Sequence, residues 1–191
     1  NLKDYWEYCK DYPGDIKEVF RVAASNYFPQ EQLNNQAYKL ESEELKYIPY
    51  RLEWIKTEKG EIVVPHQVRA IPMMPDEPED EAVYILLNGH PQGRIRNLYV
   101  AGVDSYDQDK SDTSSSLGAM VVLSGDYDFK DVPKNTPVAL IRTRPKRKEK
   151  FYEMCAMLSV YYNLMENTLI DFGKPAIIQW YKDHGLQRYL A

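Results

Sequence analysis

The sequence predicts an α/β protein built on a mixed sheet that is covered by helices. Short apolar runs at residues 98–103, 117–123 and 137–141 indicate three strands. A segment with helical periodicity follows them, and we expect a fourth short strand and a second helix after that segment. The order strand, strand, strand, helix, strand, helix is typical of a mixed sheet with helices packed on it.

The first part of the chain predicts helices. Asp15, with Glu18 three residues later, resembles a helix N-cap with its reciprocal partner. The apolar residues that follow recur at helical spacing: Ile16, Val19, Phe20 and Ala23. A second helix is expected to begin near Pro29, because proline suits the first turn of a helix.

A β-hairpin and a loop are expected next. Apolar and polar residues alternate from residue 50, which indicates two strands within residues 50–63 and a turn at 58–60. Residues 72–81 are rich in proline and acidic residues, so we expect a surface loop there. Residues 82–87 indicate a further strand.

The elements after residue 97 carry most of the predicted core. The runs at 98–103 and 117–123 are continuously apolar, which favours strands that are buried on both faces. Residues 149–162 have apolar side chains at helical spacing and predict a helix with a broad buried face. A short strand is expected at 163–167, followed by a helix that begins after Pro175 and runs toward Gly185.

Composition excludes several classes of protein. Of the 191 residues, 43% are hydrophobic and 28% are charged, which is ordinary for a folded chain and not for a disordered one. Cys9 and Cys155 have no partner cysteines or nearby histidines, so we expect neither a disulfide framework nor a zinc ribbon. No apolar run reaches the ~18 residues of a membrane span. Because the chain begins at Asn1 without a leader, we interpret it as a piece of a longer protein.

Charge is distributed unevenly along the chain. The formal net charge is -5, with 12 Lys and Arg against 17 Asp and Glu over residues 1–100 and 12 against 12 over residues 101–191. Half of the positive charges of the second part lie in one cluster: Arg142, Arg144, Lys146, Arg147, Lys148 and Lys150. We interpret this cluster either as a solvated helix start or as an edge that contacts phosphates.

Two carboxylates are expected at strand ends. Asp104 closes the run LYVAGVD, and Glu166 closes YNLME. A charged acid at the end of an apolar strand is costly unless it is paired or bound to a cation. If the two strands are neighbours, the two acids could converge on a hard cation such as Mg²⁺ or Mn²⁺. The alternative for either residue is an ordinary turn former or helix cap.

The order of several motifs resembles the nuclease domain of phage terminase large subunits and the segment before it. Residues 98–109 are LYVAGVDSYDQD and residues 112–123 are DTSSSLGAMVVL. In that family a strand ends in a metal-binding Asp, a short acidic loop follows, and the next strand pairs antiparallel. LMEN at 164–167 resembles the second acid, which is carried on a strand reached after a helix. YPGDIKEVF at 12–20 and NYFP at 26–29 resemble the segment between packaging ATPase and nuclease.

The resemblance implies a ribonuclease H-like fold, a mixed sheet flanked by helices. Residues 97–191 would form the nuclease core, truncated at its C-terminus, and residues 1–96 a linker or accessory region with helices and a hairpin. The implied activity is that of a Mg²⁺- or Mn²⁺-dependent endonuclease that cuts concatemeric double-stranded DNA during viral genome packaging. The implied partners are the portal, the small terminase subunit and the ATPase domain of the same polypeptide, in the cytoplasm of a bacterial host.

The resemblance also assigns residues to the site. Asp104 and Glu166 would be catalytic ligands for two metal ions, and Asp109 and Asp112 are candidates for a further ligand in the loop. The third essential acid of the family would follow Ala191, so we expect little cleavage from these residues alone. No Gly-x-x-x-x-Gly-Lys-[Ser/Thr] motif occurs, so we expect no ATP site in this part of the polypeptide.

Two alternatives stay open at this point. The chain could be a non-catalytic module that docks on DNA or on a portal through residues 142–150, or a resolvase- or integrase-type nuclease of the same fold. Fold alone does not separate these chemistries. No segment predicts a helix with a basic, polar face, so any DNA contacts, including those of Arg142, Arg144, Lys146, Arg147 and Lys148, would be mainly to backbone phosphates.

Overall fold

The structure is a computed structural model that describes residues 46–91, 97–106, 116–125, 134–171 and 173–191. These residues belong to one compact unit, Lys46–Ala191. The helices expected within residues 1–45 lie outside the described residues, as do the loop acids Asp109 and Asp112.

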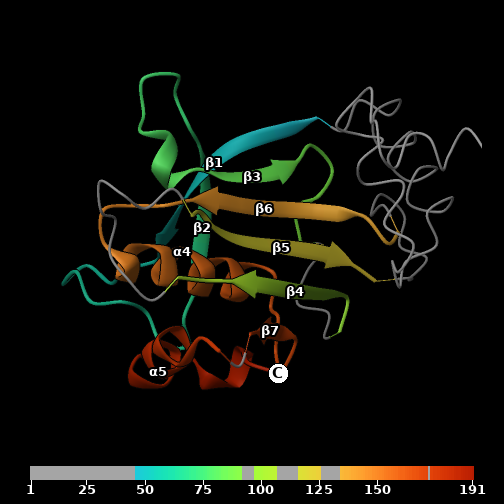
Figure 1. Ribbon diagram of the computed structural model, residues 1–191. Coiled ribbons are helices and arrows are strands. Elements are labelled where there is room, and N and C mark those ends of the chain that lie inside the picture. Colours follow the sequence, from blue (N-terminus) through green and yellow to red (C-terminus); the bar gives the residue numbers. More distant parts are fainter. Residues whose placement is uncertain (1–45, 92–96, 107–115, 126–133, 172) are drawn as a thin grey trace, which may run out of the picture. The chain divides into compact units, whose positions relative to one another are not determined.

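Seven strands form one mixed sheet in the order β2-β1-β3-β6-β5-β4-β7 (Figure 1). All neighbouring strands run antiparallel except β4 and β7, which run parallel. The strands are β1 Tyr47–Trp54, β2 Val68–Pro72, β3 Val83–Leu86, β4 Tyr99–Asp104, β5 Gly118–Ser124, β6 Pro137–Thr143 and β7 Thr168–Ile170. The described part of the chain is therefore an α/β protein with a mixed sheet, as the sequence predicts.

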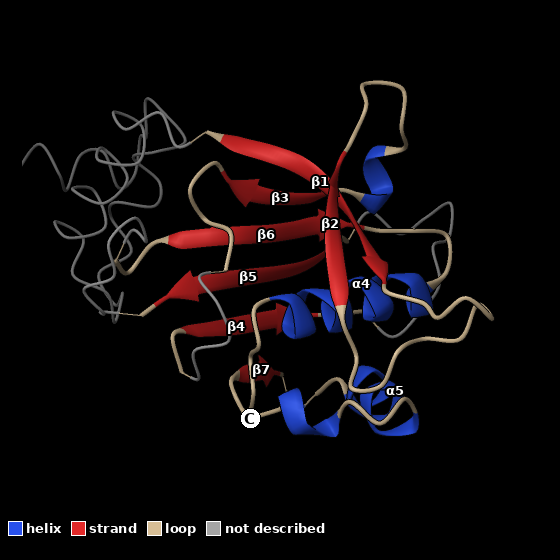
Figure 2. Ribbon diagram, turned by 180° about the vertical axis from the view of Figure 1, so that it is seen from behind, coloured by secondary structure: helices blue, strands red, loops and turns tan. Residues whose placement is uncertain are grey.

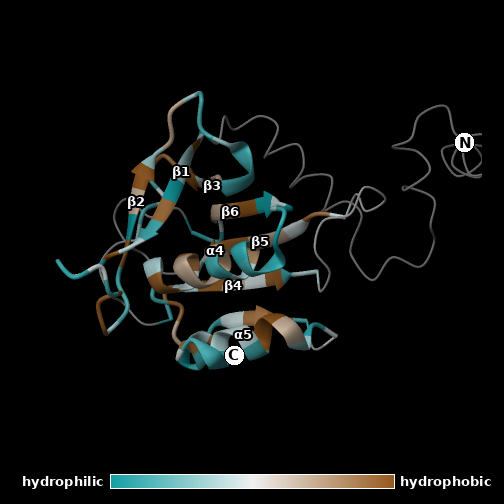
Figure 3. Cartoon of the chain, turned by 90° about the vertical axis from the view of Figure 1, so that its left-hand side faces the viewer, coloured by the Kyte–Doolittle hydropathy of each residue, from teal (hydrophilic) through white to brown (hydrophobic). Residues whose placement is uncertain are grey.

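Two α-helices lie on one face of the sheet (Figure 2). Helix α4, Lys148–Tyr161, follows β6 and returns the chain so that β7 can run parallel to β4. Helix α5, Pro175–Asp183, buries Ile177 and Tyr181 and shows both apolar and polar positions in Figure 3. Two short 3-10 helices complete the described elements, η1 Glu79–Glu81 and η2 Gln187–Tyr189.

The core lies between this helical layer and the sheet. Alternate residues of β4 and β5 face α4 and are buried, and most of α4 is buried against them. The largest fully buried side chains include Phe151, Tyr152, Met154, Leu158 and Met120. A buried apolar side chain of this size contributes about 1.5–3 kcal/mol relative to an exposed one, so this layer is the main source of stability.

Only one face of β4, β5 and β7 is covered by described residues. Val121, Leu123 and Leu169 are 37%, 40% and 55% exposed, and they lie on the face opposite α4. The expectation that β4 and β5 are buried on both faces is therefore wrong for the described part of the chain. We call this side the open face.

The first three strands are part of the same sheet. β3 pairs with β6, and the Tyr47 hydroxyl donates to the Pro137 carbonyl at 2.7 Å. The division expected between residues 96 and 97 therefore falls inside the compact unit, which begins at Lys46. The turn expected at 58–60 is present, since the Gly60 N–H donates to the Thr57 carbonyl at 2.9 Å. The strand that pairs with β1 is β2, which lies later in the chain than the partner expected within residues 50–63.

Both α-helices end in the same hydrogen-bonded motif. At the end of α4, Asn163 has a φ of 53°, and the N–H of Leu164 donates to the Ser159 carbonyl at 2.9 Å. Gly185, with a φ of 67°, plays the same role after α5. The strand expected at 163–167 is therefore wrong: these residues form turns that follow the helix, and β7 begins only at Thr168.

A buried hydroxyl joins α4, β7 and α5. The Ser159 hydroxyl donates to the Cys155 carbonyl at 2.9 Å and also lies 3.1 Å from the Thr168 hydroxyl and 3.0 Å from the Tyr181 hydroxyl. All of these groups are buried. Removing one partner of such a cluster leaves buried polar atoms without a hydrogen bond, which is costly.

We expect Ser159→Ala to lower the free energy of unfolding by about 1–3 kcal/mol, because Thr168 and Tyr181 lose a buried partner. Urea denaturation monitored by circular dichroism measures the change. Ser105→Ala is the matched control, since the Ser105 hydroxyl is buried and forms no hydrogen bond to a described residue. Equal destabilisation by both substitutions would contradict this account of Ser159.

Candidate carboxylate site

Asp104 is the last residue of β4 and lies on the open face. The two residues that follow it turn into the core: Ser105 is 3% exposed and Tyr106 is 6% exposed. The Tyr152 hydroxyl donates to the Tyr106 carbonyl at 2.8 Å, and the Tyr106 ring packs against Phe151 with centroids 5.2 Å apart. These contacts fix the backbone directly after Asp104.

The neighbour of Asp104 in the sheet is Asp171. β4 and β7 are parallel, with Gly102 opposite Leu169 and Val103 opposite Ile170, so the next position brings Asp104 opposite Asp171. Each acid lies two positions after an exposed residue, Gly102 in β4 and Leu169 in β7, so both belong to the open face, and both are exposed. Neighbouring strands are about 4.8 Å apart, so the backbones at Asp104 and Asp171 are neighbours at the same end of the sheet.

The two carboxylates have little to balance their charge. The Gly173 N–H donates to Oδ1 of Asp171 at 3.0 Å, which fixes one oxygen of that side chain. Among the described residues, neither Asp104 nor Asp171 forms an ion pair. Two adjacent negative charges repel each other, and a cation between them removes that repulsion.

The donor set suits a hard divalent cation. Mg²⁺ and Mn²⁺ take oxygen ligands, and Mg²⁺ in particular is commonly held by one or two carboxylates, with waters and substrate phosphates completing the shell. Within the described ranges no group of three or more His, Cys, Asp or Glu side chains is arranged to hold a metal ion. Asp104 and Asp171 could serve as the carboxylate ligands of such an ion, with water and substrate as its other ligands.

Glu166, the expected second ligand, lies elsewhere. It precedes β7 by two residues, and its N–H donates to the Arg188 carbonyl at 3.0 Å. Because Ala101 is opposite Thr168, Glu166 is level with the start of β4, five positions before Asp104. Five residues of strand span about 16 Å, so the backbone of Glu166 lies at the opposite end of β7 from Asp104, and its role as a ligand stays a prediction.

Sequence reasoning sets Asp171 aside because it comes too early for the family's third acid, and because it places the fourth strand at 163–167. The run TLID at 168–171 repeats the pattern of LYVAGVD at 98–104, a short apolar strand closed by an acid. Asn163, a residue that favours the left-handed conformation at a helix end, is the signal that the preceding segment is a turn.

The basic cluster begins on the open face with Arg142. Asp104 is opposite Ala119 in β5, and Ala119 is opposite Arg142 in β6, so one row across the sheet contains both residues. Arg142 is exposed and forms no ion pair with a described residue. It lies two strands from Asp104, a distance of about 10 Å between backbones, which is within reach of a ligand that bridges them.

Arg144, in contrast, is a structural residue. It is only 8% exposed, its Nη1 donates to the Ser116 carbonyl, and its guanidinium lies 4.4 Å from the centre of the Tyr106 ring. These contacts occupy the Arg144 guanidinium within the protein, and its expected contact with DNA stays a prediction. Arg144 helps to hold the segment that follows Asp104.

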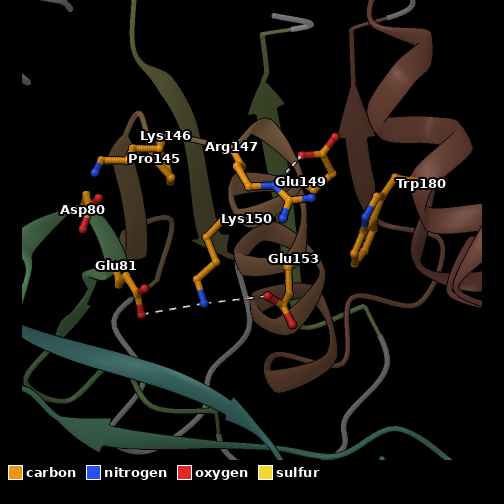
Figure 4. A pocket seen from close by; sticks show the side chains of 9 residues that line it. All are labelled: Asp80, Glu81, Pro145, Lys146, Arg147, Glu149, Lys150, Glu153 and Trp180. Atoms are coloured by element: carbon orange, nitrogen blue, oxygen red, sulfur yellow. Dashed lines mark ion pairs between the residues drawn. The ribbon is translucent and has the colours of Figure 1, made fainter. Parts of the chain in front are cut away.

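The rest of the cluster lies around a pocket of mixed charge at the start of α4 (Figure 4). In this pocket of about 560 Å³, Lys150 lies 3.7 Å from both Glu81 and Glu153, and Arg147 lies 3.7 Å from Glu149. Lys146 also lines the pocket and has no ion pair among the described residues. Acidic side chains therefore neutralise part of the positive charge of this basic cluster. Lys148 does not line the pocket.

Comparison with protein-family models, curated protein sequences and solved structures gives no match for this chain. Within the described residues, no helix combines the length and apolar character needed to cross a lipid bilayer.

We expect Asp104→Asn and Asp171→Asn each to weaken Mn²⁺ binding by at least about 10-fold, because each removes one of two neighbouring carboxylate ligands. Isothermal titration calorimetry with MnCl₂ measures the affinity. Glu166→Gln removes the same charge at the other end of β7 and should leave the affinity unchanged. A loss with Glu166→Gln but not with Asp171→Asn would favour the site expected from the sequence.

Proposed function

We propose that this chain is a metal-dependent endonuclease domain of the phage terminase large-subunit type, which hydrolyses phosphodiester bonds of double-stranded DNA. The observation that carries the proposal is the pairing of Asp104 with Asp171 at the ends of adjacent parallel strands, on a face that described residues leave open. An exposed carboxylate pair of this kind is suited to a metal ion that also contacts a substrate phosphate.

The topology supports the same proposal. The order β6-β5-β4-β7, with β4 to β6 antiparallel and β7 parallel to β4 after α4, agrees with a ribonuclease H-like core. It also agrees with the motif order of the resemblance, in which the first acid ends a strand, the next strand is antiparallel, and the second acid follows a helix. In this proposal Asp171 takes the role that the sequence suggested for Glu166.

The residues have distinct parts in this chemistry. Asp104 and Asp171 would hold Mg²⁺ or Mn²⁺, and Asp109 and Asp112 remain proposed ligands outside the described residues. A bound ion of this kind stabilises charge on the phosphoryl oxygens and supplies a nucleophilic water. Arg142, on the same row of the open face, would place its guanidinium on a DNA phosphate, where a planar fork of donors binds two oxygens.

The proposal includes partners and location. The packaging ATPase of the same polypeptide, the portal and the small terminase subunit would supply the DNA and decide when it is cut, in the cytoplasm of the host. Contacts of Arg142 and Lys146 with phosphates do not distinguish one base from another. Cleavage would therefore depend little on the DNA sequence at the cut site. The partial neutralisation of residues 147–150 by acids is less favourable to a module that docks through that segment alone.

We expect a longer polypeptide that includes the family's third acid after Ala191 to nick or linearise supercoiled plasmid DNA in Mn²⁺, and not in excess EDTA, whereas residues 1–191 alone should cleave little. Asp104→Asn and Asp171→Asn should each lower the rate at least about 100-fold, because the ion that stabilises the transition state is lost. Gel analysis of plasmid forms over time measures the rate, and Glu166→Gln is the control. Cleavage that persists in both asparagine variants would refute the proposed site, and a preference for branched DNA over plasmid would favour a resolvase.

We expect Arg142→Gln to weaken binding to double-stranded DNA and to reduce the slope of log affinity against log salt by about 1, as for the loss of one phosphate contact. Fluorescence anisotropy with a labelled duplex in Ca²⁺ measures both quantities. Arg147→Gln is the matched control, since Arg147 already faces Glu149, and should change the slope less. A larger effect of Arg147→Gln would place the DNA on the helix side of the sheet.

A further inference from the structure

A second pocket lies at the other end of β7 from Asp171. It occupies about 400 Å³ where α4 ends, and it is lined by residues of α4, of the segment around Pro65 and of η2. Its apolar walls come from Ile55, Val68, Val160 and Met165. The volume lies within the range of about 300–1,000 Å³ that is common for small-molecule sites.

The described residues that line this pocket include basic side chains and no acidic ones. Arg188 is positively charged at all physiological pH values, and His66 can gain a positive charge at low pH. No Asp or Glu is among the described residues that line the pocket. Arg188 forms no ion pair with a described residue. Glu166 donates its N–H to the Arg188 carbonyl but does not line the pocket.

The surroundings of His66 disfavour its positive charge while no anion is bound. Burial, and then the positive charges of Arg188 and His184, hold the pKa of His66 below its ordinary value. His184 is stacked on Trp180 with ring centroids 3.8 Å apart, and it forms no ion pair with a described residue. A bound anion would remove the repulsion between these groups.

The polar groups of the pocket are arranged around aromatic rings. The guanidinium of Arg188 lies 5.1 Å from the centre of the Tyr189 ring, and its Nη2 donates to the Tyr189 hydroxyl at 3.4 Å. The amide side chains of Gln67 and Asn163 also line the pocket and can donate and accept hydrogen bonds. Arginine held in this way binds phosphate with two parallel hydrogen bonds.

We propose that this pocket binds a nucleoside 5′-phosphate, with the phosphate on Arg188 and His66 and the base against the apolar wall. An inorganic anion would leave the walls formed by Val68, Val160 and Met165 without a partner, whereas a base covers them and offers polar edges to Gln67 and Asn163. The site is independent of the proposed nuclease centre, which lies at the opposite end of β7. The nucleoside 5′-phosphate can be a free nucleotide or the phosphorylated end of a DNA strand.

Isothermal titration calorimetry of the protein with dAMP tests the proposal. We expect saturable binding of dAMP, and binding at least about 10-fold weaker for deoxyadenosine and for inorganic phosphate, because each lacks one of the two recognised parts. A short oligonucleotide with a 5′-phosphate, compared with its 5′-hydroxyl form, distinguishes a strand end from a free nucleotide as the source.

Substitutions inside and outside the pocket test whether dAMP binds there. Arg188→Gln should weaken dAMP binding at least about 10-fold, and Arg188→Lys, which keeps the charge but not the fork, should have an intermediate effect. Lys182→Gln removes an exposed cation of α5 that does not line the pocket and should leave binding unchanged, as should Asp171→Asn. Thermal unfolding midpoints establish that each variant is folded.

Three outcomes would overturn the proposal. They are the absence of saturable binding by dAMP and by the phosphorylated oligonucleotide, equal affinity for inorganic phosphate and dAMP, and dAMP binding that Arg188→Gln and Arg188→Lys leave unchanged. Loss of dAMP binding in Asp171→Asn would instead assign the nucleotide to the carboxylate site.

Discussion

The parallel ladder between β4 and β7 is the constraint on which the carboxylate site depends. Strands that run in the same direction bring their C-terminal ends to one edge, so Asp104 and Asp171 meet there without any direct bond between them. A shift of one residue in this ladder would move the Asp171 side chain to the helix side. The ladder has three residue pairs, and contacts outside it also hold β7, chiefly the hydroxyl cluster of Ser159, Thr168 and Tyr181.

The position at which α4 ends sets the register of this ladder. Asn163 closes the helix with a left-handed backbone, Glu166 adopts a φ of 61°, and the chain then enters β7 at Thr168. The N–H of Leu164 is used by the helix end and that of Asn167 by the following turn, so few polar groups of this reversal are left to water. The helix end therefore has the same importance for the site as the strands themselves.

The mixed α/β sheet could be predicted from sequence, whereas the neighbouring positions of Asp104 and Asp171 could not. The apolar runs that became β4, β5 and β6 and the periodicity of α4 are local signals, which tertiary contacts reinforce. The sequence analysis placed Glu166 at the end of a strand because Leu164 and Met165 are apolar. A short apolar run does not distinguish a strand from a buried turn. The burial of Arg144 depends on Tyr106, a partner far along the chain, and no pattern of neighbouring residues reveals such a contact.

Acidic and basic side chains lie at opposite ends of β7. Asp171 follows its C-terminal end on the open face, next to the end of β4 with Asp104, and the segment before its first residue adjoins the corner of Arg188 and His66 on the side of the helices. A three-residue strand is only about 10 Å long, so regions of opposite sign are separated by the thickness and length of one short edge strand. Cations and anions are therefore drawn to different ends of the same element, and two ligands of opposite charge can be present together without competing for one surface.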